Sequence, residues 1–345
     1  MRTTENQVQE LLDLVADTSR VLVLTHNDPD PDALASAFGL LHLFRLHRSR
    51  GQRIEVAYGG LLGRSENRVF ARELHIRLRH IERLDAHQYD VIALVDTQPG
   101  AGNYTLPEEV EPQIVLDHHS RLRATSDAAF YDVRPSYGAT TTIVVEYLRQ
   151  AQVKWTPHLA TALFYGIKTD TLGLARGASP ADAEAYLFLH DQIDPVVLTC
   201  IEQAPLPIDY FRILSRALMH TTMYGHVVIT ELGTVHRPDI AAEVADFLLR
   251  MENVRWTICM GVYKRALVVS VRAAMREQHA GQLVRRAVGE RGSAGGHGTM
   301  AGGRIPLARR DVNAEISRLR ERFLTLLEVE KDGHSLLTER DITPT

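Results

Sequence analysis

The stretch THNDPDPDA, residues 25–33, decides the fold of this chain, because it carries His26, Asp30 and Asp32 directly after a short apolar run. That run, residues 21–24, is partly β-branched and is typical of a buried strand. The residues after the acids, 33–44, have the composition of a mostly buried helix, and Asp32 is its expected N-cap. The acids are therefore predicted to lie on a strand-to-helix loop.

Two prolines, Pro29 and Pro31, restrict this loop to extended geometry, so His26, Asp30 and Asp32 can be aimed at one point with little ordering entropy left to lose. Nitrogen and oxygen ligands at this spacing suit Mn²⁺ or Mg²⁺ rather than a metal that prefers thiolates. Taken alone, the stretch is equally compatible with an acidic, solvated loop that caps a helix. The rest of the chain decides between these two interpretations.

The composition is that of an ordinary globular protein. The 345 residues are 45% hydrophobic and 24% charged, which is enough chain for two domains with separate cores. A net charge of −4 argues against extended binding of long nucleic acid, which needs wide basic surfaces. Any ligand that bears phosphate must therefore be held locally.

Neither cysteine indicates a disulfide or a zinc site. Cys200 and Cys259 are far apart and belong to no CxxC pattern, so both are expected to be buried free thiols. The first ten residues are polar, and no apolar run approaches the ~20 residues needed to span a bilayer. The sequence therefore predicts a cytoplasmic protein with no membrane partner.

Two further apolar runs end in acidic residues. Residues 91–96 end at Asp96, and residues 114–119 end in the triplet Asp117-His118-His119. With another strand expected at 54–58, strands alternate with helices, which indicates an α/β fold with a doubly wound, mainly parallel sheet. Ligands of such sheets gather at the carboxyl ends of the strands, so these acids and histidines are expected on one edge.

The segments around two later helices supply further candidates. Ser136 and Tyr137 precede an amphipathic helix that runs to about residue 150, and an apolar helix over 157–167 leads to Asp170. Hydroxyl groups at the start of the first helix can either cap it or donate hydrogen bonds to a phosphate oxygen at its positive end. Tyr137 is the aromatic residue best placed to stack a base.

In order and spacing, four segments resemble the four motifs of the DHH phosphoesterases: His26-x3-Asp30-x-Asp32, Asp96 at a strand end, Asp117-His118-His119, and Thr169-Asp170. The resemblance covers residues 21–174. It implies a site for two metal ions, usually Mn²⁺, with Mg²⁺ or Co²⁺ as alternatives.

The resemblance also implies a role for each side chain. His26 and Asp30 would hold one ion, and Asp96 would bridge the two. The second ion would be held by Asp32, His118 and Asp170. Of the remaining pair, His119 would contact the phosphate in catalysis, and Asp117 would orient a neighbouring histidine.

The residue chemistry supports the same site independently of the family. Four carboxylates crowded at one edge would repel one another unless cations were present. Two cations about 3.5–4 Å apart can share a water, lower its pKa and clamp the attacked phosphoryl oxygens. Both lines of argument predict a hydrolase that acts on phosphate esters.

Residues 194–195 and 204–209 contain three prolines, which suit a connector that separates the second half of the chain. We expect a metal-binding domain over 1–194, a linker with a connecting helix over 195–225, a smaller α/β domain over 226–330 and a loosely ordered tail over 331–345. The connecting helix is predicted over 210–223.

The second domain contains the glycine-rich segment GSAGGHGTMAGG, residues 292–303. Glycine permits positive φ and lets backbone N–H groups converge on an anion, although a flexible turn is the simpler interpretation. The segment resembles the GGGHxxAAG signature of the DHH-associated domain of the first type, and Ser270-Val271-Arg272 resembles the strand that carries its arginine. The resemblance implies an active site in the cleft between the domains, with substrate bound by Arg272, His297, Gly295 and Gly296.

Two positions depart from the family pattern. Ala294 stands where the family usually has its first glycine, and Ala35 replaces a usual glycine of the first motif. Alanine has the smallest side chain after glycine, so we expect altered backbone detail and an intact site.

Together these features predict a metal-dependent phosphodiesterase that hydrolyses short oligonucleotides, such as dinucleotides and nanoRNA, to mononucleotides. The resemblance also permits a cyclic dinucleotide (c-di-AMP or c-di-GMP) or 3′-phosphoadenosine 5′-phosphate as the substrate. Inorganic pyrophosphatase is a more distant alternative, because its second domain differs. In another class, the second domain resembles the tail of alanyl-tRNA synthetases, so the chain would be an RNA-binding module. A homodimer is compatible with the sequence.

Overall fold

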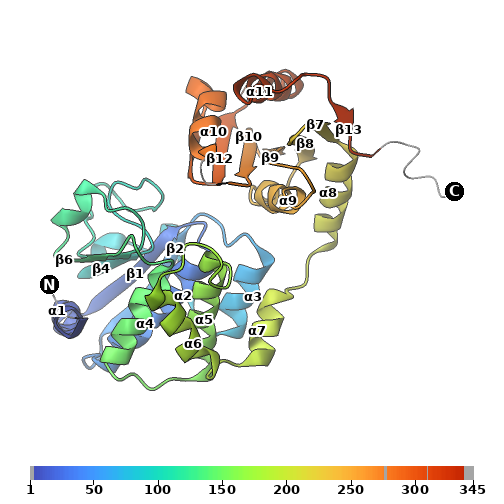
Figure 1. The fold of residues 1–345 in the computed structure, drawn as a ribbon. Coiled ribbons are helices and arrows are strands. Elements are labelled where there is room, and N and C mark those ends of the chain that lie inside the picture. Colours follow the sequence, from blue (N-terminus) through green and yellow to red (C-terminus); the bar gives the residue numbers. More distant parts are fainter. Residues whose placement is uncertain (1–3, 276–277, 309, 338–345) are drawn as a thin grey trace. The chain divides into compact units, whose positions relative to one another are not determined.

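The computed structural model describes residues 4–275, 278–308 and 310–337. These residues divide into two compact units, one up to Ala204 and one from Pro205 (Figure 1). The division falls among the prolines at which the sequence indicates a connector. Within the described ranges, every helix is too short or too polar to cross a bilayer.

The first unit is built on a six-stranded parallel sheet with the strand order β3-β2-β1-β4-β5-β6. The strands are β1 (Arg20–Asn27), β2 (Arg53–Gly59), β3 (Leu78–His80), β4 (Val91–Val95), β5 (Ile114–Asp117) and β6 (Phe130–Val133). The chain runs outward from β1 to β3 and then crosses to the other side of β1 to begin β4. This confirms the doubly wound order and makes β1 and β4 the topological switch point, where ligands of such sheets bind.

The two faces of this sheet are covered differently. Alternate strand residues such as Val21 and Val23 pack into one large core with the α-helices, whereas Leu22 and Leu24 face short 3₁₀ helices and loops. The α-helices are α1 (Thr4–Ala16), α2 (Pro31–Leu46), α3 (Ser65–Glu73), α4 (Thr140–Gln150), α5 (Pro157–Thr171), α6 (Pro180–His190) and α7 (Pro195–Glu202). The 3₁₀ helices are η1 (Ile81–Arg83), η2 (Ala86–Gln88) and η3 (Arg123–Asp127).

The start of α2 differs from the prediction. Pro31 takes the first helical position, where its fixed φ suits the helix and no N–H is needed. Asp30 is therefore the N-cap, and its Oδ1 accepts a hydrogen bond from the backbone N–H of Ala33 at 3.0 Å. The prediction that Asp32 is the N-cap is wrong, because Asp32 lies inside the first turn and is 1% exposed. Its carboxylate is consequently available to a different helix.

Helices α2, α4 and α5 pack closely because glycine lies at their contacts. A Cβ at Gly166 of α5 would lie 2.7 Å from the Cβ of Ala35 on α2 and 2.6 Å from Oγ1 of Thr141 on α4. A Cβ at Gly39 of α2 would lie 2.5 Å from Cγ1 of Val144 on α4. Ala35, one of the two departures from the family pattern, is accommodated because the residue that faces it is a glycine.

The second unit contains a seven-stranded sheet in the order β11-β12-β10-β9-β8-β7-β13. Strands β8 and β9 are parallel, and the other neighbours are antiparallel. The strands are β7 (Thr221–Tyr224), β8 (Val227–Thr234), β9 (Trp256–Tyr263), β10 (Ala266–Ala273), β11 (Ser293–His297), β12 (Met300–Pro306) and β13 (His334–Ser335).

Helices cover both faces of this second sheet. One core contains residues of α10 and α11, and the other contains residues of α8 and α9. The helices are α8 (Ile208–Met219), α9 (Ile240–Leu248), α10 (Ala280–Val288), the 3₁₀ helix η5 (Gly289–Arg291) and α11 (Val312–Leu326). The unit is the smaller α/β domain that the sequence predicts.

Several local predictions for the later part of the chain are corrected. The helix predicted over 210–223 ends at Met219, because the next residues pair with β8 as strand β7. The glycine-rich segment forms the β11–β12 hairpin. Residues 334 and 335, predicted to belong to a loosely ordered tail, pair with β7, while 338–345 lie outside the described residues. Cys259 is buried as predicted, but Cys200 is exposed on α7.

Candidate metal centre

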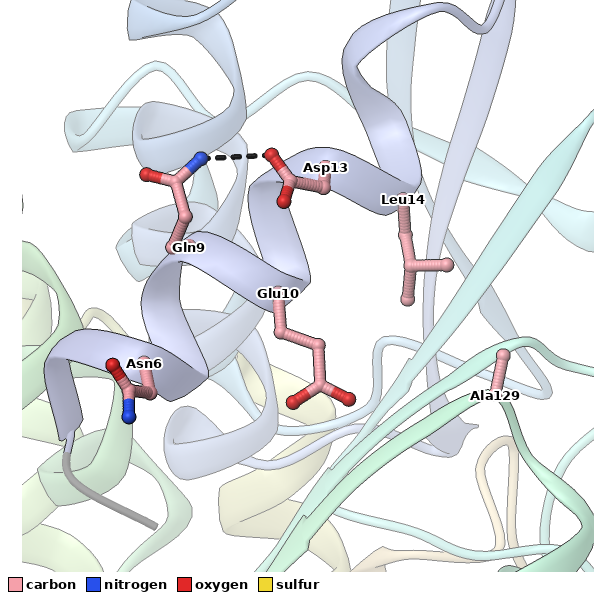
Figure 2. Close-up of a pocket in the computed structure, with 6 residues that line it drawn as sticks. All are labelled: Asn6, Gln9, Glu10, Asp13, Leu14 and Ala129. Atoms are coloured by element: carbon pink, nitrogen blue, oxygen red, sulfur yellow. Dashed lines mark hydrogen bonds between the residues drawn. The ribbon is translucent and has the colours of Figure 1, made fainter.

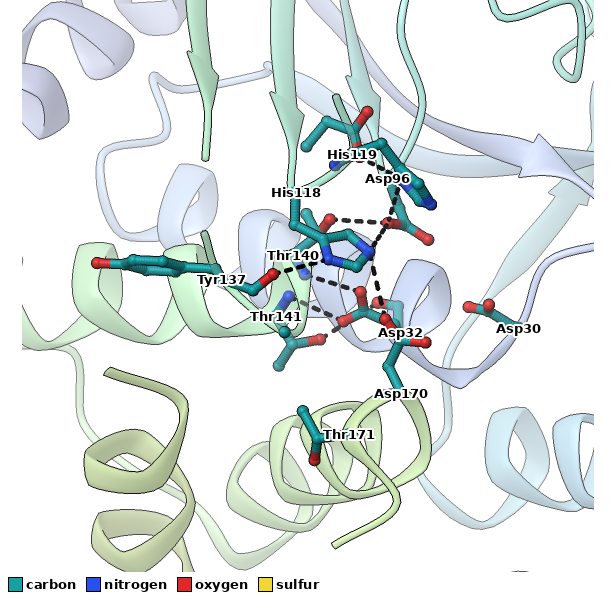
Figure 3. A network of polar contacts seen from close by, with 12 residues as sticks. Asp30, Asp32, Asp96, His118, His119, Tyr137, Thr140, Thr141, Asp170 and Thr171 are labelled. Atoms are coloured by element: carbon teal, nitrogen blue, oxygen red, sulfur yellow. Dashed lines mark hydrogen bonds and ion pairs between the residues drawn. The ribbon is translucent and has the colours of Figure 1, made fainter. Parts of the chain in front are cut away.

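The acidic and imidazole side chains that the sequence singles out as ligands meet at the carboxyl ends of β1, β4 and β5 (Figure 3). Helix α2 contributes two acids from its first turn and N-cap, and the last turn of α5 contributes a third. All six predicted metal ligands fall into three groups, in each of which the ligand atoms lie within 4.8 Å of one another: His26-Asp30-Asp96, Asp96-His118-His119 and Asp32-His118-Asp170.

Asp96 joins these groups in the way that a bridging ligand requires. Its Oδ2 lies 3.4 Å from Nε2 of His26, and its Oδ1 lies 3.6 Å from Nε2 of His118. The two carboxylate oxygens therefore face different histidines. His118 links the groups further, because its Nε2 also lies 3.2 Å from Oδ2 of Asp170.

Backbone carbonyls fix the orientation of two imidazole rings. Nδ1–H of His26 donates to the carbonyl of Asn27 at 2.8 Å, and Nδ1–H of His118 donates to the carbonyl of Tyr137 at 3.2 Å. Because a carbonyl only accepts, Nδ1 carries a proton, and in the neutral ring Nε2 carries the lone pair. In both rings the nitrogen that faces the carboxylates is thus the one that offers a lone pair to a metal once its own proton is lost.

The N-terminus of α4 holds Asp32. The backbone N–H groups of Thr140 and Thr141 each donate to one oxygen of this carboxylate at 2.8 Å. The hydroxyl of Thr140 donates to Oδ1 of Asp96 at 2.7 Å. The N-cap of α4 is Ala139, and no side chain caps the helix, so the capping role that the sequence leaves open is not the observed one. The donors at this helix end serve acids of the centre.

The backbone at Asp96 is in the left-handed region, with φ of 58°. Aspartate and asparagine adopt this conformation more readily than other residues with a Cβ, and such strain gathers at functional sites. The N–H of Asp96 donates to the carbonyl of Leu116 at 2.9 Å, which holds the turn against β5. The turn thus places Asp96 directly after β4, within reach of the other candidate ligands.

The charges in this centre are unbalanced. Burial and the carboxylates of Asp96 and Asp170 raise the pKa of Asp32 well above its usual value. Burial and Asp30 likewise raise the pKa of Asp170 to about 6. Although burial alone lowers it, hydrogen bonding to Asp30 and Asp96 raises the pKa of His26. The protein therefore holds protons where positive charge is lacking, and oxygen and imidazole donors of this kind fit a divalent cation.

His119 is oriented by a buried chain of hydrogen bonds. Its Nδ1–H donates to Oδ1 of Asp117 at 2.8 Å, and Nε2 of Gln98 donates to the other oxygen of Asp117 at 2.7 Å. Gln98 is 1% exposed and also accepts from the hydroxyl of Thr125 at 2.6 Å. Asp117 thus has the orienting contact that the resemblance implies. Gln98 lies two residues after Asp96, yet nothing in the sequence marked it.

Arg176 is a second residue that the sequence analysis did not identify. Its Nε and Nη2 donate to the backbone carbonyl of Asp170 at 3.2 and 2.8 Å, and Nη2 lies 3.7 Å from Oδ1 of the same residue. The chain turns back here through Leu172 and Gly173, both with positive φ. The sequence carries two signals for such a turn: Gly173, and the separation of six residues between Asp170 and Arg176.

The substrate residues predicted for the first unit lie outside the three groups. Ser136 is exposed. The ring of Tyr137 points away from the carboxylates, and its hydroxyl donates to Oε1 of Glu146 at 2.7 Å (Figure 3). Arg134 lies over the same ring, 5.0 Å from its centroid. The backbone carbonyl of Tyr137, rather than its ring, reaches the centre.

The substrate residues predicted for the second unit lie on β10 and β11. Arg272 is 7% exposed, and its Nε donates to Asp246 at 2.5 Å. A Cβ at Gly296 would lie 2.4 Å from Cα of Ala301, so glycine is needed there, whereas Gly295 faces open space. The side chain of His297 lies outside the described part of the chain.

A separate recess is lined by one face of α1 and by Ala129 (Figure 2). It contains Glu10 and Asp13 but none of the predicted metal ligands. It is therefore not part of the centre.

Two family models match the chain. Residues 20–167 match the model described as the DHH family, N-terminal domain, and residues 225–325 match the DHHA1 domain. Together the two domains define the class of DHH phosphoesterases with a C-terminal DHHA1 domain. The chain therefore contains a DHH domain followed by a DHHA1 domain.

Curated relatives extend over different parts of the chain. An uncharacterized protein of Methanocaldococcus jannaschii is 35% identical over 83% of this chain and 58% of its own length. A protein of Bacillus subtilis named cyclic-di-AMP phosphodiesterase GdpP is 25% identical over 71% of this chain and 39% of its own. A probable manganese-dependent inorganic pyrophosphatase of Listeria monocytogenes is 28% identical over 45% of this chain and 49% of its own.

The chain thus spans from 39% to 58% of the length of these curated relatives. Among solved structures, an exopolyphosphatase-related protein of Bacteroides fragilis has the same fold, with a TM-score of 0.73 over 93% of this chain and 97% of that one. Its sequence identity of 14% makes this a statement about fold alone.

Proposed function

We propose that the chain is a metal-dependent phosphodiesterase that hydrolyses short oligonucleotides. The observation that carries this proposal is the arrangement around Asp96, whose two oxygens face His26 and His118 in two adjoining groups of ligands. Two adjoining groups that share a carboxylate suit a pair of divalent cations, and Mn²⁺ agrees with the name of the Listeria relative.

Such cations would supply Lewis-acid charge to the phosphate oxygens and to the attacking water. The side chains of the protein have separate tasks. His26, Asp30, Asp32, Asp96, His118 and Asp170 hold the ions. His119 would act in its protonated form, because Asp117 raises its pKa, although burial alone lowers it. Its Nδ1–H donates to Asp117, and its Nε2–H would donate to a phosphate oxygen and so stabilise charge that develops as the ester bond breaks.

Two features of the chain favour a short substrate. A chain with net charge −4 has few cations to spare for a long polyanion, and a dinucleotide needs few. The second domain offers Arg272 and the glycine-rich hairpin, which suit a terminal phosphate or base. A cyclic dinucleotide is the second candidate, because the relative named as a cyclic-di-AMP phosphodiesterase aligns with 71% of this chain.

The test is product analysis with purified protein and Mn²⁺. Five substrates are offered in parallel: a linear diribonucleotide, a 24-mer RNA, a cyclic dinucleotide, 3′-phosphoadenosine 5′-phosphate and pyrophosphate. Conversion of the linear dinucleotide to mononucleotides with the long RNA nearly untouched is the expected result. Preferred opening of the cyclic compound would replace the substrate class, and no hydrolysis of any of the five would refute the enzyme and favour the RNA-binding module.

Replacing Arg272 by lysine tests the role of the second domain. Lysine keeps the charge but loses the planar fork that holds two phosphate oxygens at once. We expect KM for the dinucleotide to rise about tenfold with kcat and Mn²⁺ affinity unchanged, since a lost bidentate contact is worth about 1.4 kcal/mol or more. The control is Arg250→Lys, at an arginine of the same domain that follows α9. A fall in metal content with KM unchanged would contradict this role.

A further inference from the structure

Asp182 lies on α6 and belongs to none of the ligand groups found among the described residues, yet its side chain is completely buried. Its Oδ2 accepts hydrogen bonds from the backbone N–H of Gly138, the backbone N–H of Ser179 and the hydroxyl of Ser179, at 2.7, 2.7 and 2.6 Å. Its Oδ1 accepts from the hydroxyl of Thr142 at 2.5 Å. A buried carboxylate with four donors holds its neighbours in a defined arrangement.

Two of these four contacts exceed what the helix needs. Asp182 is the N3 residue of a capping box, in which it accepts from the N–H of Ser179 and Ser179 accepts from its N–H. That motif satisfies two N–H groups at the start of α6 without a contact to another segment. The bonds from Gly138 and Thr142 instead join α6 to the chain that enters α4.

The segment that Asp182 holds, residues 138–142, lies next to the metal centre. Gly138 follows Tyr137, whose carbonyl accepts from Nδ1–H of His118. Between the two residues that Asp182 anchors are Thr140 and Thr141, whose N–H groups hold Asp32. One buried carboxylate therefore anchors both ends of the segment that orients ligands from two other elements.

The fit around Gly138 leaves no room for a side chain at this position. A Cβ at this position would lie 2.7 Å from Cγ2 of Thr171 and 3.1 Å from Oδ2 of Asp182. Thr171 directly follows Asp170, so the same packing also contacts the end of α5 that carries the last ligand. Segment 138–142, α5 and α6 meet at this point.

We infer that Asp182 is a positioning residue of the metal centre: it holds segment 138–142 so that the carbonyl of Tyr137 sets the ring of His118 and the start of α4 sets Asp32. This inference deepens the proposed function and rests on it, because it treats these residues as metal ligands. Asp182 acts through them and does not itself reach the ions.

The test is Asp182→Asn. Asparagine has the same shape but only one acceptor oxygen, so it cannot serve donors on both sides of the group. We expect Mn²⁺ affinity, measured by isothermal titration of the metal-free protein, to fall at least tenfold. The matched control is Ser179→Ala, which removes the cap of α6 and leaves the bonds from Gly138 and Thr142 in place. This variant should melt at a lower temperature and bind Mn²⁺ like the wild type.

A milder variant keeps the test decisive if Asp182→Asn does not fold. Thr142→Val removes the single hydroxyl that donates to Oδ1 of Asp182. The Mn²⁺ affinity of this variant should again fall, whereas that of Ser179→Ala should not. Wild-type Mn²⁺ affinity in folded Asp182→Asn, or in Thr142→Val, would overturn the inference. Mn²⁺ binding by the wild type without hydrolysis of any of the five substrates would instead overturn the proposed function and leave the positioning role standing.

Discussion

Replacing Asp96 by asparagine is expected to lower kcat for the dinucleotide by about 10³-fold or more while the fold is kept, since a lost bridging charge removes several kcal/mol of stabilisation. Asparagine tolerates the left-handed backbone at this position as well as aspartate does, so the turn after β4 should survive. What is lost is the negative charge between His26 and His118.

The same substitution has two opposed effects on the metal-free protein. It relieves repulsion among buried carboxylates, because Asp96 contributes to the raised pKa of Asp32. It also removes a charge that raises the pKa of His26 and His118, so we expect the melting temperature to rise only at high pH, where these imidazoles are neutral. The measurement is kcat at saturating Mn²⁺ together with the melting temperature in a chelator. Asp90→Asn is the matched control, because Asp90 accepts from backbone N–H groups at the opposite end of the sheet, far from the ligands. Undiminished turnover in Asp96→Asn would refute the bridging assignment.

Mn²⁺ is expected to raise the melting temperature of the first unit, and by more at pH 8 than at pH 5. A ligand present at about 100 times its dissociation constant adds about 2.7 kcal/mol of stability, which for a unit of this size is about 5–10 °C. The difference between the two pH values follows from the protons that the metal-free centre holds.

The direction in which stability changes with pH follows from the direction of each pKa shift. The pKa of Asp170 is raised to about 6, so the folded metal-free protein binds a proton that the unfolded chain releases, and this stability is lost as pH rises through about 6. The raised pKa values of His26 and His118 act in the same direction. Asp30 has a lowered pKa, so its contribution is lost only in strong acid, outside this range. Metal ions compete with these protons and therefore bind more tightly at higher pH.

The measurement is a pair of thermal melts, with Mn²⁺ and with a chelator, at each pH. In the chelator the melting temperature should fall from pH 5 to pH 8, and Mn²⁺ should reverse that slope. Asp170→Asn removes one of the raised carboxyl groups and should flatten the slope in the chelator. An Mn²⁺-induced shift of the same size at both pH values would contradict the linkage.

The sheet could be predicted because its strands are short apolar runs that end in polar residues. Val21–Leu24, residues 91–95 and residues 114–116 each carry enough apolar residues for complete burial, and their order along the chain leaves few topologies. That the candidate ligands come together could be predicted for the same reason, since they follow the ends of such runs or of an apolar helix.

The supporting residues could not be predicted, because their contacts join segments that are distant in sequence. Gln98 reaches Asp117 across two strands, and Asp182 reaches Gly138 across 44 positions. Local propensity favours either aspartate as the N-cap of α2, and only the proline between them decides. Strand β7 cannot be predicted from local sequence, because its four residues gain their strand conformation from pairing with β8.

The glycines between α2, α4 and α5 have a consequence for metal selectivity. Asp32 lies on α2, its anchoring N–H groups lie on α4, and Asp170 lies on α5, so the width of the cavity offered to an ion is set where these helices touch. Those contacts are Gly39 and Gly166, which belong to none of the ligand groups found among the described residues. Under the proposed function, discrimination between ions of different radius would therefore depend on the packing of these helices, and it would change through residues that never meet the ion.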